Sequence, residues 1–482
     1  MNFRPPLRFL GRLTLVLAAA ELAPFICCLV FGEAADARAF LISGLVAALA
    51  GGTMMLLGSG AGDLYRREGI LIVVGGWVLA SIFGALPYML TGVLTGPADA
   101  LFESASGFTT TGASVMTDIE AAGYGLLFWR SFTQWLGGMG IIVLFVALLP
   151  ELGPGARFLY KMEVPGPTAE ALQPRIRTTA MTLWKIYLGF TVAETLLLML
   201  AGMGLYDALT HTFSTMSTGG FSPRNASVAA FDSPWIHVIV IVFMIFAGAN
   251  FSLFYGMRRR RNWNLFRDSE FRIYIGVIGA AMALLTWDLL RSGTYTQPFR
   301  AVLDSLFQAV TILTTTGFAT TDFVHWPVFA RMLLVVLMFV GGCAGSTAGS
   351  MKVMRMVIGI KSALREVRLI FSPSTIQAVF VQGKAVPDSV VRSVAGFFIL
   401  YLSAWGFGAL LLSIGAPDLI TAATASAATL GNIGPGLRAV GPTENYAGFN
   451  AAEKLLMIVL MWLGRLEVYS IAALFTRAYW RP

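Results

Sequence analysis

The chain has few of the residues on which soluble and secreted proteins depend. Of its 482 residues only 12% are charged, whereas soluble domains carry about 25%. The three cysteines lie in apolar or glycine-rich stretches, so they indicate neither a disulfide framework nor a metal-binding spacing. The three histidines fall near the ends of apolar segments and form no Cys/His cluster. An intramembrane enzyme is therefore only a remote alternative, because its catalytic constellation is missing.

What the chain does have is apolar sequence. Hydrophobic residues make up 56% of it, and several apolar segments reach the length of about 20 residues that a membrane-spanning helix needs. The net charge of +8 comes from basic residues in the short loops between these segments. That distribution is a topology signal rather than a sign of nucleic-acid binding. It predicts a multi-pass protein of the cytoplasmic (inner) membrane, with both termini in the cytoplasm.

A segment that opens with Asp and ends with Gly 13 positions later recurs four times. Each copy has Leu or Ile two residues after the Asp and Thr two residues before the Gly. The copies are Asp99–Gly112, Asp207–Gly220, Asp304–Gly317 and Asp418–Gly431. Their final glycines are 108, 97 and 114 residues apart, which indicates one structural unit used four times.

Each segment predicts a short helix followed by a glycine-containing turn. The expected N-caps of these pore helices are Asp99, Asp207, Asp304 and Asp418. A helix of about 10 residues ends at membrane depth, where its free carbonyl groups are tolerated only if they face a water-filled cavity. Four such ends around one axis would form a ring of carbonyl oxygens that can replace the water around a potassium ion. Close packing of small residues between membrane helices is the alternative for any one copy.

These patterns predict an all-α membrane protein with an N-terminal helix pair and four pseudo-fourfold repeats of helix, pore helix, filter and helix around a central ion pore. The expected boundaries are 1–65 for the pair, then 66–180, 181–270, 271–385 and 386–482 for the repeats. We expect the links between repeats to be cytoplasmic because they are basic, as in the run Arg258–Arg261. Glu103 in the first pore helix is expected to brace the filter, and Arg130 to reach the membrane interface near a helix end.

The combination of four such units in one chain resembles the Trk/Ktr/HKT superfamily of potassium transporters, and the N-terminal helix pair resembles its Trk-type membrane subunit. The resemblance covers roughly residue 70 to the C-terminus. The motifs that carry it are FESASGFTTTGAS, HTFSTMSTGGFS, TTTGFATTDF and ATLGNIGPGL. The resemblance implies a pore in each subunit of a homodimer, and a cytoplasmic nucleotide-binding ring as regulatory partner.

The resemblance also implies which residues bind the ion. K⁺ would bind the backbone carbonyls of Thr110, Thr111, Gly112, Thr218, Gly219, Gly220, Thr315, Thr316, Gly317, Thr429, Leu430, Gly431 and Asn432. The filter glycines would be Gly112, Gly220, Gly317 and Gly431. In sodium-permeable plant relatives the first of these is Ser, so four glycines imply potassium selectivity. The residue before the glycine differs among the quarters, which leaves the strictness of selection open.

The second helix of repeat three is interrupted by four glycines within nine residues. Each glycine costs about 1 kcal/mol in a helix relative to alanine, so this stretch opposes helix formation. The resemblance implies an intramembrane gating loop here, formed by Gly341, Gly342, Gly345, Ser346, Thr347 and Gly349. Arg465, inside the last apolar segment, would be an electrostatic barrier below the filter. The alternatives are a helix-packing face for the glycines and a structural ion pair of Arg465 with Glu467 or Glu194.

The predicted function is gated potassium uptake through this filter. No covalent cofactor is expected; K⁺ is the transported ion, and any regulatory nucleotide would bind the partner rather than this chain. Coupling of potassium uptake to sodium or protons remains an alternative, because no acidic residue is clearly placed as a proton relay.

Overall fold

The structure, a computed structural model, describes residues 3–58, 66–140, 176–254, 265–372 and 377–480. The Arg258–Arg261 run and most of the basic link after repeat one lie outside these residues. The chain begins with the predicted helix pair. Its members are the nearly continuous α1 (Arg4–Ala20) and α2 (Leu22–Phe31), followed by α3 (Ala34–Leu57). The pair packs beside the first repeat through contacts of α1 with α4 and of α2 with α6.

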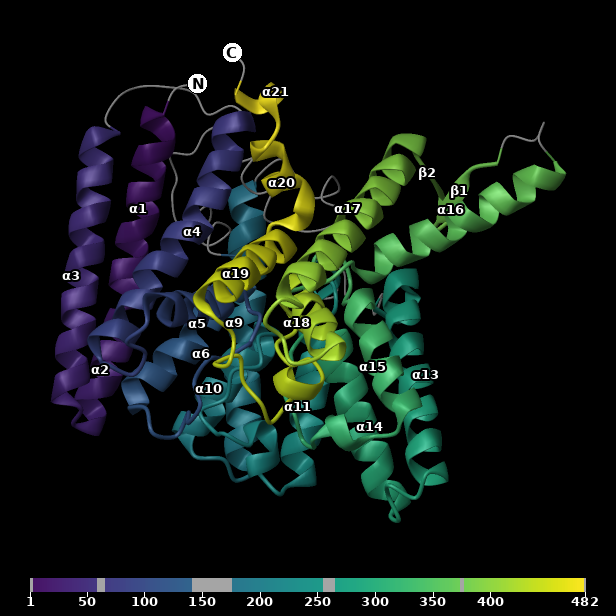
Figure 1. Ribbon diagram of the computed structural model, residues 1–482, viewed down its shortest axis with the longest axis horizontal. Coiled ribbons are helices and arrows are strands. Elements are labelled where there is room, and N and C mark those ends of the chain that lie inside the picture. The colour runs from purple at the N-terminus through teal and green to yellow at the C-terminus, as the bar shows by residue number, and fades with distance from the viewer. Residues whose placement is uncertain (1–2, 59–65, 141–175, 255–264, 373–376, 481–482) are drawn as a thin grey trace.

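Each of the four repeats has the predicted order of elements (Figure 1). The first helices are α4 (Arg66–Leu90), α9 (Ile176–Leu200), α13 (Ser269–Arg291) and α17 (Asp388–Leu412). The pore helices are α5 (Pro97–Phe108), α10 (Leu205–Met216), α14 (Pro298–Leu313) and α18 (Leu419–Gly431). Proline in the first turn begins α5 and α14, where its missing N–H has no partner to lose.

The second helix of every repeat is shorter than the roughly 20 residues that a membrane-spanning helix needs. These helices are α6 (Tyr124–Gly138), α11 (Pro234–Ala247), α15 (Val328–Val340) and α19 (Ala451–Arg465). After α15 the chain passes through a loop into α16 (Val353–Phe371), and after α19 it bends by 118° into α20 (Glu467–Leu474). We expected one interrupted helix, in repeat three. The structure has a break in repeats two, three and four, and in repeat one α6 ends at Gly138, two residues before the described part of that repeat stops; glycines lie at or beside the helix end in repeats one and two as well.

The repeats close into a ring. The second helix of each repeat packs against the pore helix of the next: α6 on α10, α11 on α14, and α15 on α18. The helix α19 of repeat four then packs on α5 of repeat one. This cyclic order is the pseudo-fourfold arrangement that the sequence repeat predicts.

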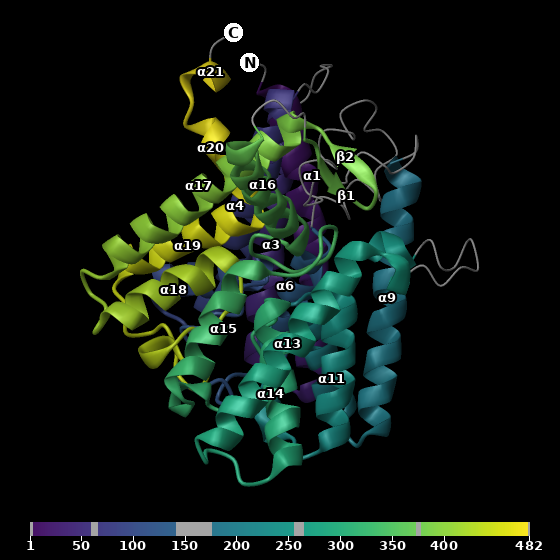
Figure 2. The ribbon, with the colours of Figure 1, turned by 90° about the vertical axis from the view of Figure 1, so that its right-hand side faces the viewer.

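The remaining elements lie toward one end of the molecule. A short antiparallel hairpin, β1 (Val379–Val381) with β2 (Lys384–Val386), follows α16, and α21 (Arg477–Trp480) ends the described chain. Figures 1 and 2 show the hairpin and both chain ends at the same end of the molecule. Among the described residues six helices are long and apolar enough to span a membrane, or seven if α19 and α20 count as one span.

Candidate functional site

The chain leaves three of the pore helices through the same unusual turn. Two residues before the expected filter glycine, Thr110, Thr218 and Thr315 have φ angles of 56°, 55° and 57°. This left-handed conformation is uncommon for residues other than glycine. The glycines that follow, Gly112, Gly220 and Gly317, also have positive φ, at 80°, 77° and 84°. The sequence repeat therefore corresponds to a repeated backbone geometry in the first three quarters.

In the fourth quarter the same turn lies three residues later than predicted. The left-handed residues there are Asn432 (φ 54°) and Gly434 (φ 94°). Between them, the Ile433 N–H donates to the Ala428 carbonyl at 2.9 Å, the counterpart of the Thr111 bond to Ser106. The predicted filter residues Thr429, Leu430 and Gly431 instead form the last turn of α18.

The three-residue error in the predicted position of this turn has a local cause. Asp418 is the N-cap of α18, and its carboxylate accepts the Thr421 N–H at 2.9 Å. Counted back from the filter glycine, it corresponds to Gly96 and Gly204, the N-caps of α5 and α10, rather than to Asp99 and Asp207. Matching the four aspartates by sequence therefore shifted the whole fourth copy. The signal that would have corrected it is Asn followed by a second glycine, because Asn tolerates the left-handed turn.

The other three aspartates are not caps, since Asp99 and Asp207 lie within the first turn of α5 and α10, and Asp304 lies six residues after the start of α14. Asp99 forms an ion pair with Lys454 Nζ at 2.6 Å, and Asp207 forms one with Arg224 at 2.7 Å. Asp304 accepts hydrogen bonds from the Tyr295 and Thr320 hydroxyls. These contacts tie the pore helices to segments outside them, so the aspartates are part of the scaffold.

The four filter segments meet edge to edge. A Cβ placed on Gly112 would collide with the Gly219 carbonyl oxygen, and one on Gly220 with that of Thr316. Likewise, a Cβ on Gly317 would collide with the Ile433 carbonyl oxygen, and one on Gly434 would approach that of Thr111 to 2.8 Å. Each glycine thus lies against the carbonyl of a neighbouring quarter, and the fourth quarter closes on the first. The four glycines also line one shared cavity.

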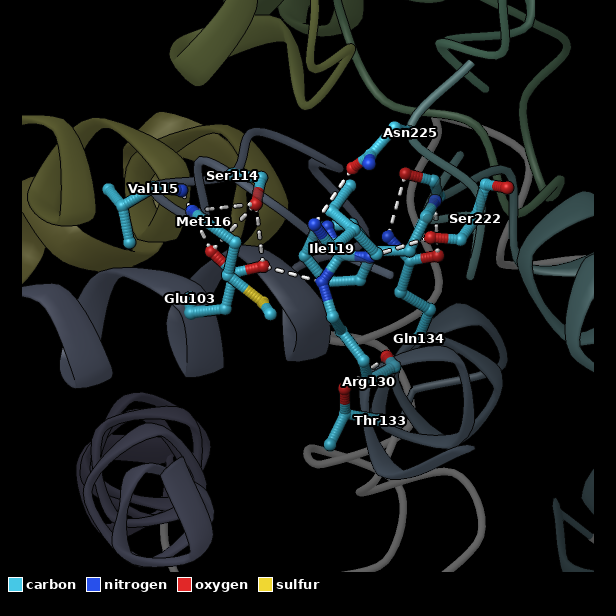
Figure 3. A network of polar contacts seen from close by, with 12 residues as sticks. Glu103, Ser114, Val115, Met116, Ile119, Arg130, Thr133, Gln134, Ser222 and Asn225 are labelled. Carbon is cyan, nitrogen blue, oxygen red and sulfur yellow. Dashed lines mark hydrogen bonds and ion pairs between the residues drawn. The ribbon is translucent and has the colours of Figure 1, made fainter. Parts of the chain in front are cut away.

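A buried ion pair braces the loops above the first two quarters (Figure 3). Glu103, fully buried on α5, accepts Arg130 Nε at 2.6 Å and the Val115 N–H at 2.9 Å. Arg130 also donates to the Ser222 carbonyl at 2.9 Å and lies over the Phe221 ring. Glu103 therefore has the bracing contacts expected of it. The expectation for Arg130 was wrong, because this residue is 2% exposed and lies inside the protein.

The Gly341–Lys352 segment is a loop folded beneath the filter. Gly341 and Gly345 have positive φ, and the Cys343 N–H donates to the Gly248 carbonyl at 2.8 Å. The Gly349 N–H donates to the hydroxyl of the filter residue Thr315 at 2.7 Å. The Ala344 N–H donates to Glu270 at 2.7 Å. The loop is thus held by repeat two, by the first helix of repeat three and by the filter.

Of the predicted gate residues, Gly345, Ser346, Thr347 and Gly349 line a cavity below the filter, while Gly341 and Gly342 form the upstream end of the loop. Arg465 lines the same cavity and joins three parts of the protein. Its guanidinium donates to the Thr110 hydroxyl at 3.1 Å and to the Thr347 carbonyl at 2.8 Å. It also donates to the carbonyls of Gly137 and Gly138 at the end of α6, at 2.6 and 2.7 Å.

The alternative ion pair partners of Arg465 have other surroundings. Glu467 forms an ion pair with Arg355 at 2.6 Å. Glu194 lies fully buried on α9, and neither of its carboxylate oxygens has a hydrogen-bond partner in the described part of the chain. The structure therefore places Arg465 against the filter, the loop and α6, which is the position predicted for a barrier. Whether it repels cations stays a prediction.

A ring of four pore-helix units with carbonyl-lined turns defines a membrane transport protein of the potassium-channel-like type. A family model described as TrkH, cation transport protein, matches residues 37–481. The chain belongs to this TrkH cation transport family. It is a transport protein rather than an enzyme, and its fold is an all-α membrane fold.

Relatives and a solved structure match over the whole chain. The Trk system potassium uptake protein TrkH of Escherichia coli (strain K12) is 38% identical, with 100% of both chains covered. The Trk system potassium uptake protein TrkG of the same strain is 34% identical, over 98% of this chain and 97% of the relative. The crystal structure of the potassium transporter TrkH from Vibrio parahaemolyticus superimposes with a TM-score of 0.90 at 37% identity, and covers 100% of both chains.

Proposed function

We propose that this chain takes up potassium across the cytoplasmic membrane through a pore at the centre of its four repeats. The observation that carries the proposal is the closed ring in which each filter glycine lies against a carbonyl of the neighbouring quarter. Carbonyl oxygens arranged around an axis can replace the hydration shell of K⁺. The relatives named for potassium uptake, matched over the whole chain, give the same ion.

The ion-binding segments in this proposal are Thr110–Gly112, Thr218–Gly220, Thr315–Gly317 and Asn432–Gly434. The first three are those predicted from the sequence. The fourth keeps the predicted Asn432 but drops Thr429, Leu430 and Gly431, because those three residues are helical. Glycine at all four positions allows the neighbouring carbonyl to approach where a side chain would exclude it.

Gating is assigned to the loop beneath the filter together with Arg465. Their hydrogen bonds to Thr315 and Thr110 connect both elements directly to filter residues. A guanidinium below a cation filter repels cations, and non-helical backbone at this depth is suited to movement because it lines a cavity. We propose that displacing the loop and Arg465 opens the pathway toward the cytoplasm.

The assembly proposed is a homodimer controlled by a cytoplasmic nucleotide-binding partner. The face on which this partner would dock includes α16, whose Lys361, Arg365 and Arg368 lie on the same helix that begins at the gating loop. A partner that moves α16 could therefore move the loop. The basic residues of this helix also support a cytoplasmic location for it and for both termini.

A second candidate function is potassium uptake coupled to protons. It is favoured by Glu194, a fully buried carboxyl group in a membrane helix whose oxygens have no hydrogen-bond partner in the described chain. Ionisable groups at such positions are often transport sites. If uptake is coupled in this way, a pH gradient should drive potassium accumulation in liposomes, and Glu194→Gln should abolish that dependence while potassium still moves down its own gradient.

The proposal is tested by ion flux in liposomes that hold the purified protein, with potassium or sodium gradients, for the unchanged protein and Gly112→Ser. We expect potassium to move, sodium to move much more slowly, and the variant to lose this preference. Because an absent partner can leave the gate closed, a variant shortened within the loop between residues 341 and 350 is measured alongside. The proposal would be overturned if neither the unchanged protein nor the shortened variant moved potassium or rubidium.

A further inference from the structure

The first and third quarters of the ring brace the residue before the filter glycine in the same way. In quarter one the Thr111 hydroxyl lies 2.8 Å from that of Thr109, which donates to the Ala105 carbonyl at 2.6 Å. In quarter three Thr316 lies 2.8 Å from Thr314, which donates to Val310 at 2.7 Å. A pair of threonine hydroxyls thus ties each filter segment to its own pore helix.

The second quarter cannot form this brace, because its corresponding residue is Gly219 and has no side chain. The hydroxyl of Ser217, which stands where the other quarters have Thr109 and Thr314, donates to Ser214 at 3.1 Å instead. The space beside Gly219 is filled from another repeat. A Cβ on Gly219 would collide with the amide group of Gln134, a fully buried side chain of α6.

The Gln134 amide bonds to the filter backbone on both sides of the second filter glycine, Gly220. Its Nε2 donates to the Gly219 carbonyl at 2.7 Å, and its Oε1 accepts the Phe221 N–H at 3.0 Å. Figure 3 shows this side chain reaching from α6 toward the segment that carries Ser222. The Gly219 carbonyl is the one against which Gly112 of quarter one lies. One glutamine therefore fixes the point where quarters one and two meet.

We propose that Gln134 is a positioning residue for ion selection, and that it replaces in quarter two the threonine brace of quarters one and three. The proposal rests on the filter function proposed above. A carbonyl oxygen has two lone pairs, so a hydrogen bond from Gln134 leaves one available for an ion and fixes the direction of the carbonyl. A ring that must discriminate K⁺ from Na⁺ depends on the positions of its carbonyls. Gln134 and Gly219 are in this sense one coupled unit.

The test compares four variants in the liposome flux assay. Gln134→Leu keeps the approximate volume and removes both hydrogen bonds. Gln308→Leu is the matched control, because Gln308 is also a fully buried glutamine, on pore helix α14, but its amide has no hydrogen-bond partner in the described chain. Gly219→Thr introduces the side chain found in quarter one. The double variant Gln134→Ala with Gly219→Thr removes the glutamine and supplies the threonine.

We expect Gln134→Leu to lower the ratio of potassium to sodium flux by about tenfold, the effect of losing one or two net hydrogen bonds, while Gln308→Leu leaves the ratio unchanged. Gly219→Thr should lose selective transport through its clash with Gln134. The double variant should recover it, because Gly219 does not have a left-handed φ and Ser217 offers a hydroxyl to the new threonine. Membrane abundance is measured for every variant, so that a folding defect is not read as lost selectivity.

Two results would overturn the inference: wild-type selectivity in Gln134→Leu, or a double variant no better than Gly219→Thr. If Gln134→Leu does not reach the membrane, the double variant decides: selective potassium transport restored relative to Gly219→Thr supports the inference, and transport no better than that of Gly219→Thr overturns it. The unchanged protein separates this inference from the proposed function. Selective potassium flux in it or in the variant shortened within the loop, together with either negative result, removes only the role of Gln134, whereas absence of selective flux in both removes the filter function itself.

Discussion

The fourth filter segment depends on individual residues that the repeat pattern did not single out. Gly431 is the last residue of α18, and a Cβ there would meet the flexible Ile433 side chain at 2.9 Å. Gly434 has a φ of 94°, and a Cβ there would meet backbone atoms of Thr111 and Gly112. The two glycines, three residues apart, therefore have different roles although both follow a pore helix.

We predict that Gly434→Ala abolishes or reverses potassium preference, whereas Gly431→Ala leaves most of it. An alanine at Gly434 is strained by the left-handed backbone and crowds the first quarter, while Ile433 can move aside for one at Gly431. Rubidium uptake in potassium-starved cells, with sodium as competitor, measures the difference. A stronger loss in Gly431→Ala than in Gly434→Ala would favour the assignment made from the sequence.

The sequence predicted the position of the left-handed turn correctly in three quarters and wrongly in the fourth. The difference has a physical reason. In the first three, Thr and Gly occupy the left-handed positions that the repeat aligns. In the fourth, Asn432 occupies the first of them, so matching by residue type selected a Thr and a Gly inside the helix. The hydrogen bonds of Gln134 were not predictable either, because its partners Gly219 and Phe221 lie 85 and 87 positions further along the chain. Contacts at that separation leave no local pattern.

At the scale of elements, the second helix of repeats two, three and four is broken beside the cavity below the filter. The glycine-rich composition predicted this break for repeat three. In repeat four the break needs no glycine run, since α19 ends at Arg465 and Glu467 begins α20 with a positive φ of 56°. Arg465 is thus both the end of an element and its link to the loop and to α6.

We predict that Arg465→Ala raises the cation flux of the protein without its partner by about tenfold or more. The substitution removes a positive charge and a charge-assisted hydrogen bond to the loop, and each such bond is worth roughly 1.5–3 kcal/mol. A shift of about 1.4 kcal/mol toward the open state already raises the population of that state, and with it the cation flux, about tenfold. Liposome flux at a fixed potassium gradient measures the effect.

The matched control for this variant is Arg291→Ala, because the Arg291 side chain is 65% exposed at the end of α13, away from the cavity. It should leave basal flux unchanged. Unaltered flux in Arg465→Ala, at normal abundance, would show that Arg465 supports the fold without limiting permeation.

At the scale of the whole molecule, the ring order and the position of the chain ends define two faces. The filter glycines open to a cavity lined by loops such as Pro442–Tyr446. The loop proposed as the gate leads to α16 and the β-hairpin, at the end of the molecule where both termini lie (Figure 2). The proposed topology places the first face outside and the second in the cytoplasm.

We predict that a cysteine at Lys384 reacts with a membrane-impermeant thiol reagent only from the cytoplasmic side, and one at Gly448 only from the outside. Both positions are exposed, one in the hairpin and one in a loop on the filter side. The reagent is applied to whole cells and to inside-out vesicles, in a background without Cys27, Cys28 and Cys343. Labelling of both positions from one side would contradict the topology.

The central claim is that four filter segments form one cation site. The most direct measurement is the anomalous scattering of Rb⁺ in crystals of this protein soaked with rubidium. We expect a peak on the axis between the carbonyls of Thr111, Gly219, Thr316 and Ile433, which excess K⁺ displaces and excess Na⁺ does not. A ring that stays empty in rubidium, or a peak that Na⁺ displaces equally well, would contradict a potassium-selective filter at this position.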